Sequence, residues 1–439
     1  MATVPNDMMY ESQDSLTGLG DLSQLRASVA SWNEGAPQSS GACPLHAMLI
    51  TLGRIDTVNV AFGETVGDGA LAEVAQRIRH FASDELESHP WLAARISGGA
   101  FMLITRAECS NERWQWLAEA LADALAKPIA NPSAGGSVRL SPRFALMSAN
   151  GADNLDSMLD RLSETAARMR RSPGRRIDWS SGAVSSSARS NIQLEGDLLA
   201  AIDRQEIEIL FQPQYSLVDD RLIGAEALAR WDHPVVGRIG AGTLFQIAER
   251  ADHIAQLSRH IAVRAMEEAK NWPDHLRLSI NITPSDLAVD NFAIEFARIA
   301  DEVGFPLRRI TLEITEQVLL SDLDRVSRTL QQLKVLDARI ALDDFGAGFC
   351  NFRYLKVLPI DCLKLDRSMV DGVLEDERDR AVFRAIMGMA KALELRVLVE
   401  GIETEAQRDF VAAEDCEYYQ GFLRAQPMPS HAFLSKATR

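Results

Sequence analysis

The sequence is poor in cysteine, and its few cysteines are not arranged for a structural role. Five cysteines are an odd number, and no two of them stand in a CxxC spacing. A disulfide framework needs paired cysteines, and a cysteine zinc site needs closely spaced ones, so neither is expected to organise the fold. This usage is typical of a reducing compartment, and we predict a cytoplasmic protein.

Long apolar runs and an excess of basic residues are also missing. No stretch of about 18 uncharged apolar residues is present, as a membrane helix would require, and the first residues lack the basic and apolar regions of a signal peptide. The 439 residues carry 62 acidic against 46 basic side chains, a formal net charge of −16. Because nucleic-acid binding needs a basic surface, we expect neither a nucleic-acid nor a membrane partner.

Composition along the chain predicts two folded domains. Residues 1–13 are polar and are expected to be disordered, and residues 173–190 are rich in Ser, Gly and Arg, as exposed linkers are. The predicted domains are therefore 14–172 and 191–439. In the first, apolar strand-like runs alternate with amphipathic helical patterns, which indicates a compact α/β domain. The strands are expected at 46–53 and 100–106, and the helices at 69–86 and 114–127.

The second domain has a more regular pattern. Eight apolar strands recur, most of them separated by helix-length amphipathic segments such as 244–272. The strands are expected at 208–217, 222–231, 276–283, 309–316, 338–346, 362–366, 396–403 and 418–423. Eight β/α repeats in roughly 250 residues are typical of a (β/α)₈ barrel. An open doubly wound sheet is the alternative, but no GxGxxG phosphate motif follows the first strand.

Polar residues interrupt these strands at or near their carboxyl ends, where barrel enzymes place catalytic groups. They are Glu226, Asn281, Glu313, Asp343, Asp344, Lys364, Glu400 and Gln420. A single such carboxylate is more often a loop contact or a salt bridge. Since burying an unpaired charge costs several kcal/mol, their repetition on strand after strand indicates one functional site.

The residue types at these positions favour a hard divalent cation. Oxygen ligands without His or Cys suit Mg²⁺ or Mn²⁺ and argue against zinc. The adjacent Asp343 and Asp344 allow one carboxylate to bridge two ions about 3.5–4 Å apart, as in metal-assisted phosphodiester hydrolysis. Lys364 could hold a hydroxide or a departing negative charge, or it could form a structural ion pair with one of the acids.

The same residues stand in motifs that resemble a known family. The segments FQPQYSLVDDRLIGAEALARW, NIT, LEITE, DDFGAGF, LPIDCLKLDRSMV, VEGIET and YYQGFLRAQPMP occur in order over 191–439. Together they resemble the EAL domain of cyclic di-GMP phosphodiesterases. The resemblance implies a modified (β/α)₈ barrel with one antiparallel strand. It also implies hydrolysis of cyclic di-GMP to linear pGpG with two Mg²⁺ or Mn²⁺ ions, and a homodimer formed through the barrel.

The resemblance also implies a role for each matching position. The first metal would be held by Glu226, Asn281, Glu313 and Asp343, and the second by Asp343, Asp344 and Glu400. Lys364 and Gln420 would contact the nucleophilic water, Glu316 would steady the loop after DDFG, and Arg230 would contact a substrate phosphate with Gln212 nearby. That loop departs from the family's DFGxGxSS at Cys350 and Asn351. A catalytically silent cyclic di-GMP receptor is therefore the alternative to an active enzyme.

Residues 14–172 resemble, more weakly, the GGDEF domain of diguanylate cyclases. The pieces that match are 14–25, 50–71 and 94–101. The signature becomes Ser97-Gly98-Gly99-Ala100-Phe101, and the two metal positions fall on Thr51 and Gly53, neither of which can replace a carboxylate toward Mg²⁺. The RxxD inhibition site would fall on 88–91, which read SHPW. The resemblance thus implies a degenerate, regulatory domain without cyclase activity. Asn59 matches a guanine-contacting position, so GTP is a candidate ligand, although Asn59 could equally be an ordinary loop residue.

Overall fold

The computed structural model describes residues 13–34, 45–53, 55–86, 89–107, 109–131, 136–149, 153–170, 176–180, 191–315, 323–346 and 354–437. The chain divides into two compact units, residues 1–194 with 233–243 and residues 195–232 with 244–439, and each is described by itself. Among the described helices, none combines the length and the apolar character needed to cross a membrane. The predicted disordered start lies outside these residues except for Gln13.

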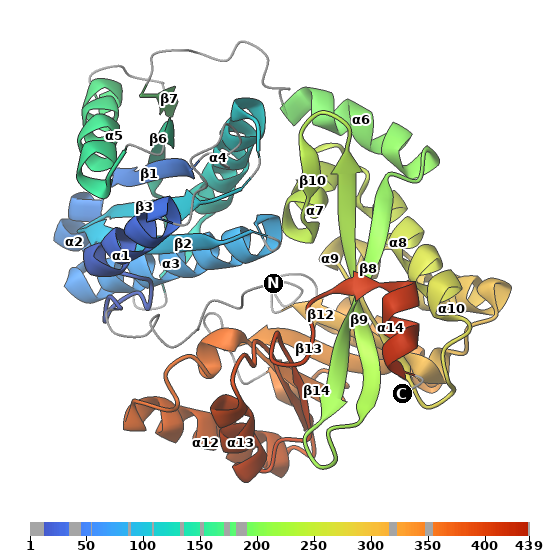
Figure 1. Ribbon diagram of the computed structural model, residues 1–439. Helices are drawn as coiled ribbons and strands as arrows, with labels where there is room; N and C mark the ends of the chain where they lie inside the picture. The colour runs from blue at the N-terminus through green and yellow to red at the C-terminus, as the bar shows by residue number, and fades with distance from the viewer. Residues whose placement is uncertain are drawn as a thin grey trace. The chain divides into compact units, whose positions relative to one another are not determined.

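The first unit is built on a five-stranded sheet in the order β2-β3-β1-β6-β7 (Figure 1). All neighbouring strands are antiparallel except β6 and β7. The strands are β1 (Leu45–Gly53), β2 (Trp91–Ser97), β3 (Ala100–Thr105), β6 (Ser141–Ala149) and β7 (Ile177–Trp179), with a separate pair β4 (Ile129–Asn131) and β5 (Gly136–Val138). The strands predicted at 46–53 and 100–106 are present as β1 and β3.

Helices complete this unit. They are α1 (Leu22–Glu34), α2 (Ile55–Phe62), α3 (Glu64–Glu85), α4 (Asn111–Ala126) and α5 (Leu155–Arg170). The apolar stripes of α1 and α5 share one buried core with the sheet, in which Leu25 and Met158 are fully buried. On α4, Trp114 Nε1 donates a hydrogen bond of 3.2 Å to the carbonyl of Ala47 in β1. The α/β character predicted for this part of the chain is therefore correct.

The predicted linker at 173–190 needs a correction. Residues 177–179 form β7, which pairs with β6 at the edge of the sheet. Trp179 is buried, and Asp178 accepts a hydrogen bond of 3.0 Å from Arg168 Nε. A three-residue strand is too short to show a periodic pattern within a segment rich in Ser, Gly and Arg. Residues 181–190 of the predicted linker lie outside the described part of the chain.

The second unit contains a closed eight-stranded barrel. Its strands follow the order β9-β11-β12-β13-β14-β15-β16-β8, and β8 pairs with β9 to close the sheet. They are β8 (Ile207–Ser216), β9 (Leu222–His233), β11 (Arg277–Ile282), β12 (Ile310–Thr315), β13 (Arg339–Phe345), β14 (Cys362–Leu365), β15 (Arg396–Val399) and β16 (Tyr418–Gln420). All pairs are parallel except those of β8, which is antiparallel to both neighbours. The predicted barrel with one antiparallel strand is confirmed, and closure excludes an open doubly wound sheet.

Helices and short segments connect these strands (Figure 1). They are α6 (Asn191–Asp203), β10 (Gly237–Ile239), α7 (Ala241–Arg250), α8 (Ile254–Ala269), α9 (Pro284–Leu287), α10 (Phe292–Val303), α11 (Leu323–Val335), α12 (Glu377–Ala392), α13 (Glu405–Ala413), β17 (Met428–Pro429) and α14 (Ser430–Ala437). The segment 244–272, predicted as one amphipathic helical stretch, forms the two helices α7 and α8. The break falls at Asp252, which has a left-handed φ of 58° that a continuing α-helix does not allow.

Strand alternation decides which side chains enter the barrel. In β12, Ile310, Leu312 and Ile314 lie on one face of the strand, while Thr311 and Glu313 lie on the other. Thr311 and Glu313 line the barrel interior, so the apolar set faces the surrounding helices. Side chains that enter a barrel stack in layers, each built from alternate strands. The polar residues of the sequence motifs are thereby brought to common levels inside the barrel.

Candidate active site

Two adjacent layers inside the barrel hold most of the predicted site residues. The inner layer is Glu226 of β9, Glu313 of β12, Lys364 of β14 and Gln420 of β16, all of them buried. The outer layer, nearer the carboxyl ends, is Gln212 of β8, Asn281 of β11, Asp343 of β13 and Glu400, which directly follows β15. Neighbouring strands are in register at these levels, with Asn281 opposite Glu313 and Gln212 opposite Glu226.

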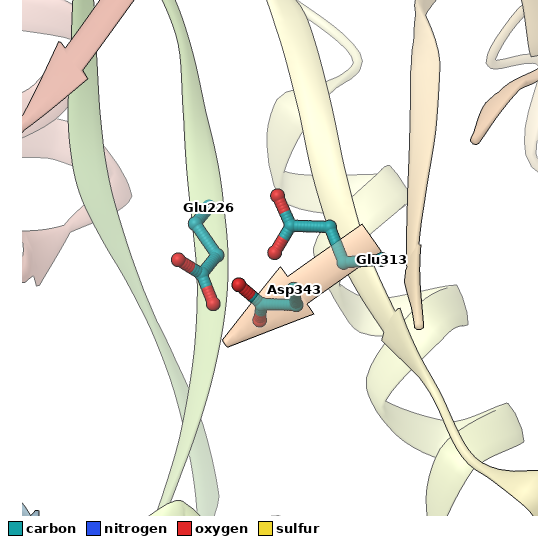
Figure 2. Close-up of side chains that lie close together, drawn as sticks. All are labelled: Glu226, Glu313 and Asp343. Atoms are coloured by element: carbon teal, nitrogen blue, oxygen red, sulfur yellow. The ribbon is translucent and has the colours of Figure 1, made fainter. Parts of the chain in front are cut away.

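Lys364 lies at the centre of the acidic groups and is 1% exposed. Its Nζ is 2.6 Å from Glu313 Oε2, 2.9 Å from Asp343 Oδ1, 2.9 Å from Glu400 Oε1 and 3.3 Å from Glu226 Oε2. Figure 2 shows the carboxyl groups of Glu226, Glu313 and Asp343 pointing toward one another. An ammonium group has three protons, so four carboxylate partners leave these acids only partly compensated.

Amide side chains orient Glu226 from two sides. Asn281 Nδ2 donates to Glu226 Oε1 at 2.9 Å, and Gln420 Nε2 donates to Glu226 Oε2 at 2.8 Å and to Gln212 Oε1 at 3.0 Å. Gln420 Oε1 in turn accepts from Gln214 Nε2 at 3.1 Å. Sequence reasoning did not include Gln214 in the site. The two-residue alternation of QPQ in β8, which puts Gln212 and Gln214 on one face, is the signal that could have found it.

The backbone at Asp344 explains how two consecutive aspartates serve one site. Ordinary alternation would send Asp343 and Asp344 to opposite faces of β13. Here the pairing of β13 with β14 shifts register between Leu342 and Phe345, and Asp344 has a left-handed φ of 56°. A bulge of this kind re-aims side chains and is frequent beside active sites. As a result, Asp343, Asp344 and Glu400 each offer an oxygen, and these oxygens lie within 4.8 Å of one another.

The electrostatics of the cluster favour a cation. Burial raises the pKa of Glu313 and Glu400 well above the usual value even though Lys364 opposes the shift, and burial likewise raises the pKa of Asp343. Burial alone would lower the pKa of Lys364, but the surrounding carboxylates, Asp343 first, raise it well above the usual value. The pKa of Glu226 is lowered because Lys364 and the amides of Gln420 and Asn281 outweigh its burial.

The residues present fit a pair of divalent cations. Besides the group around Asp344, a second trio of oxygens, from Glu226, Glu313 and Asp343, lies within 4.8 Å. The two groups share Asp343, which can therefore bridge. Five carboxylates and one ammonium leave four formal negative charges, the number that two divalent cations neutralise. An all-oxygen donor set suits Mg²⁺ or Mn²⁺ better than zinc.

The other predicted residues lie further along β9 or outside the described part of the chain. Arg230 lies on the same strand as Glu226, four residues further on, and is buried, with its Nη1 donating to the carbonyl of Ala229 at 2.9 Å. Glu316, Cys350 and Asn351 lie outside the described residues. The structure therefore brings together Gln212 and every predicted metal ligand, together with Lys364 and Gln420.

In the first unit, the residues that the resemblance aligns with the GGDEF motifs lie on β1, on α2 and at the hairpin of β2 and β3. Thr51 and Gly53 belong to β1, and Gly98 occupies the β2–β3 turn with a φ of 45°. Asn59 lies on α2, and its Oδ1 is buried without a hydrogen-bond partner among the described residues. Ser88, the first residue of the segment that the resemblance aligns with the RxxD site, lies outside them.

The fold and the site together define a class of protein. Its members are closed barrels with one antiparallel strand, and they carry an acidic centre suited to divalent cations at the carboxyl ends of the strands. Comparison with known families agrees with this class and identifies the family within it. Residues 195–427 match the EAL domain family, and residues 11–176 match the family described as diguanylate cyclase, GGDEF domain. The chain belongs to the EAL domain family, and the predicted GGDEF-EAL order is confirmed.

Individual relatives support the same assignment. The chain is 31% identical over 400 residues to the bifunctional diguanylate cyclase/cyclic di-GMP phosphodiesterase MucR of Pseudomonas aeruginosa, covering 88% of this chain and 56% of that protein. It is 28% identical over 428 residues to the cyclic di-GMP phosphodiesterase NbdA of the same organism, covering 95% and 52%. The chain thus spans about half the length of the curated relatives it matches.

Solved structures extend the comparison to the fold. The P. aeruginosa MucR phosphodiesterase in complex with c-di-GMP matches with a TM-score of 0.52 and 31% identity, covering 55% of this chain and 100% of that one. The S helix-GGDEF-EAL part of Vibrio cholerae LapD bound to c-di-GMP matches with a TM-score of 0.51 and 18% identity over 94% of this chain. At that identity the second likeness concerns the fold alone.

Proposed function

We propose that the barrel is a cyclic di-GMP phosphodiesterase that releases linear pGpG and requires two Mg²⁺ or Mn²⁺ ions. The observation that carries the proposal is the buried Lys364 surrounded by four carboxylates at the carboxyl ends of the strands. Membership in the EAL family and the similarity to MucR and NbdA supply the substrate class. The reaction adds water across one phosphodiester bond, giving a 5′-phosphate and a free 3′-hydroxyl.

Each site residue has a role in this proposal. Glu226, Asn281, Glu313 and Asp343 would hold the first ion, and Asp343, Asp344 and Glu400 the second. When bound, the ions lower the pKa of a water molecule and offset the charge that develops on the phosphate. The Lys364 ammonium would position the nucleophilic water and balance negative charge beside it. Gln420, whose amide is held by Gln212, Gln214 and Glu226, would contact the same water.

The remaining predicted residues would bind the substrate or support a loop beside the site. Arg230 and Gln212 would bind a phosphate of the substrate, because a guanidinium group matches phosphate oxygens with two parallel hydrogen bonds. Glu316 would steady the loop after DDFG. Cytoplasmic location, where cyclic di-GMP would be available, stays a prediction.

The first unit is proposed to regulate the barrel rather than to synthesise cyclic di-GMP. Thr51 and Gly53 stand where the resemblance requires metal-binding carboxylates, and Gly99 and Ala100 replace both acidic signature residues. The unpaired Oδ1 of Asn59 is a free acceptor among the described residues, which supports GTP as a candidate ligand. A homodimer through the barrel is the expected assembly, and light scattering after gel filtration tests it.

The decisive experiment measures turnover by chromatography and the binding of cyclic di-GMP by calorimetry. Purified protein in Mg²⁺ or Mn²⁺, with and without GTP, is incubated with cyclic di-GMP, and the nucleotides are separated by chromatography. We expect pGpG to accumulate, and Glu226→Gln to reduce its formation by at least about 100-fold because a metal ligand is removed. Glu302→Gln, which removes an exposed carboxylate on α10, is the matched control and keeps full activity. Tight binding without hydrolysis under all these conditions would favour the silent receptor instead.

A further inference from the structure

The opposite end of the barrel carries a feature that the phosphodiesterase reaction does not use. A cavity of about 790 Å³ opens at the amino-terminal ends of the strands and extends inward to Glu313 and Lys364. Its outermost layer consists of Arg277, Arg339 and Arg396, the first residues of the alternate strands β11, β13 and β15. Bulky branched apolar residues usually fill such layers in barrels of this type, so three arginines at one level are unusual.

These arginines have no carboxylate partner within the described part of the chain. Arg277 donates from Nη1 to the carbonyl of Arg308 at 2.6 Å and from Nη2 to that of Ile310 at 2.9 Å. Arg396 donates from Nη1 to the Tyr418 hydroxyl at 2.7 Å. Arg339 forms neither a hydrogen bond nor an ion pair with a described residue. Burial together with the nearby charge of Arg339 lowers the pKa of Arg277 to about 10.

The charge balance at this end is positive although the chain is strongly acidic. Six basic side chains line the cavity there, Arg277, Arg308, Arg309, Lys334, Arg339 and Arg396, against three carboxylates. Asp361 is 2.7 Å from Lys334 Nζ, and Asp274 is 3.5 Å from Arg309 Nη1. The third carboxylate, Glu394, is exposed. The basic side chains left without a carboxylate partner among the described residues are therefore Arg308 and the three arginines of the layer.

Space and hydrogen-bond donors are available beside this layer. The next levels inward carry small or polar side chains, among them Thr311, Ser279 and Ala341, which leave the cavity open behind the arginines. The Tyr418 hydroxyl accepts from Arg396 and the Thr311 hydroxyl accepts from Arg277 at 3.4 Å, so each keeps its own proton to donate. A volume of 790 Å³ lies within the range of small-molecule sites, about 300–1,000 Å³.

We propose that the amino-terminal mouth of the barrel is a binding site for a small, multiply charged phosphate-bearing anion, held by Arg277, Arg339 and Arg396. Guanidinium groups pair with phosphate oxygens through two parallel hydrogen bonds, and three of them converge on one opening. The ligand class includes both an inorganic polyphosphate and a nucleotide phosphate. The arginine layer lies at the end of the cavity away from Glu313 and Lys364, since Arg339 and Asp343 stand four residues apart on β13, roughly 13 Å along a strand.

The test uses the full chain freed of metal on a chelating resin, so that no cation at the acidic cluster can recruit the anion. Inorganic pyrophosphate and guanosine 5′-monophosphate are titrated separately by calorimetry. The variant Arg339→Gln with Arg396→Gln removes two guanidinium groups that make no contact with a backbone carbonyl. Arg298→Gln with Arg384→Gln removes the same charge from exposed ion pairs on α10 and α12 and is the matched control.

We expect at least one of the two anions to bind the wild-type chain and the control alike, and the cavity variant to bind it about 100-fold more weakly, about tenfold for each charged hydrogen-bonding group lost. If pyrophosphate alone binds, the ligand is an inorganic polyphosphate. If pyrophosphate and guanosine 5′-monophosphate both bind, the site also accommodates a nucleoside. The melting temperature of each unliganded variant shows whether it is folded, and Arg339→Lys with Arg396→Lys, which keeps the charge, recovers part of the affinity. Failure of both anions to bind the wild type, or equal binding by the cavity variant and the control, would overturn the proposal.

Discussion

Replacing Lys364 with methionine probes the acidic cluster most sharply. The variant keeps the apolar length of the side chain and removes the ammonium group that four carboxylates contact at 2.6–3.3 Å. Removing one partner of a buried ion pair costs about 3–5 kcal/mol, because the remaining charge is not compensated. We therefore expect the metal-free barrel to lose about 3–5 kcal/mol of unfolding free energy. For a domain of this size the melting temperature falls by roughly 10 °C.

The pKa shifts fix how this loss depends on pH. The pKa of Glu313 and of Glu400 is above the usual 4.5 in the folded chain, so these carboxyls keep protons at pH values where the unfolded chain has released them. Their contribution to stability therefore falls as the pH rises from 4.5 through the raised values. Without the ammonium group the folded-state pKa of both carboxyls rises further. The difference between Lys364→Met and the wild type is thus larger at alkaline than at acidic pH.

The assay is thermal unfolding followed by circular dichroism in EDTA, at a mildly acidic and a mildly alkaline pH. Lys391→Met is the matched control, since Lys391 pairs with Asp415 at 3.5 Å and both side chains are at least 80% exposed. A surface pair of this kind contributes at most about 1 kcal/mol. Saturating Mn²⁺ is expected to restore much of the lost stability of Lys364→Met, because the ions supply the missing positive charge. If Lys364→Met has the same melting temperature as the wild type at alkaline pH without metal, the reasoning is refuted.

Three further predictions concern single positions. Asp344→Asn keeps a residue type that tolerates the left-handed backbone but removes one carboxylate, so we expect one bound ion instead of two by elemental analysis and turnover about 100-fold lower. Gly224→Ala places a Cβ 2.4 Å from the carbonyl oxygen of Arg277 in the next strand, so the free energy of unfolding in urea should fall by about 1–3 kcal/mol. Burial lowers the pKa of His46 to about 4, so the unfolding free energy of the first unit should fall by up to about 3 kcal/mol as the pH falls from 6.5 to 4. In His46→Gln, the unfolding free energy measured in urea should depend less on pH over this range.

Each of these has a clear opposing result. Two ions retained by Asp344→Asn would remove Asp344 from the metal site. Unchanged stability of Gly224→Ala would mean that β9 and β11 separate easily at this level. An equally steep pH profile in His46→Gln would assign the acid sensitivity of the first unit to another group.

Much of the barrel could be predicted because its strands are apolar runs of ordinary length. All eight expected strands are present, and Glu313 and Lys364, near the carboxyl ends of their strands, reach the barrel interior by simple alternation. The division of 244–272 into two helices was missed because neither Gly nor Pro marks it. The left-handed Asp252 breaks the helix, and an aspartate is a weak signal for that conformation.

The geometry of the site could be predicted only in outline. Sequence motifs place Asp343 and Asp344 together, but the bulge that lets both face the same group depends on the register between β13 and β14. The four contacts of Lys364 likewise depend on barrel closure, which brings β9 within reach of β14. The arginine layer at the other end was not noticed, since Arg277, Arg339 and Arg396 are far apart in sequence and meet only when the barrel closes.

The central claim is that the acidic cluster is a metal-dependent phosphodiesterase centre. The most direct measurement is the rate of pGpG formation by the wild-type chain in Mn²⁺, then after excess EDTA, and then after Mn²⁺ is restored. The account predicts turnover, its complete loss on chelation and its recovery with metal. Absence of pGpG in the presence of Mn²⁺ and Mg²⁺, or turnover that continues unchanged in EDTA, would contradict it.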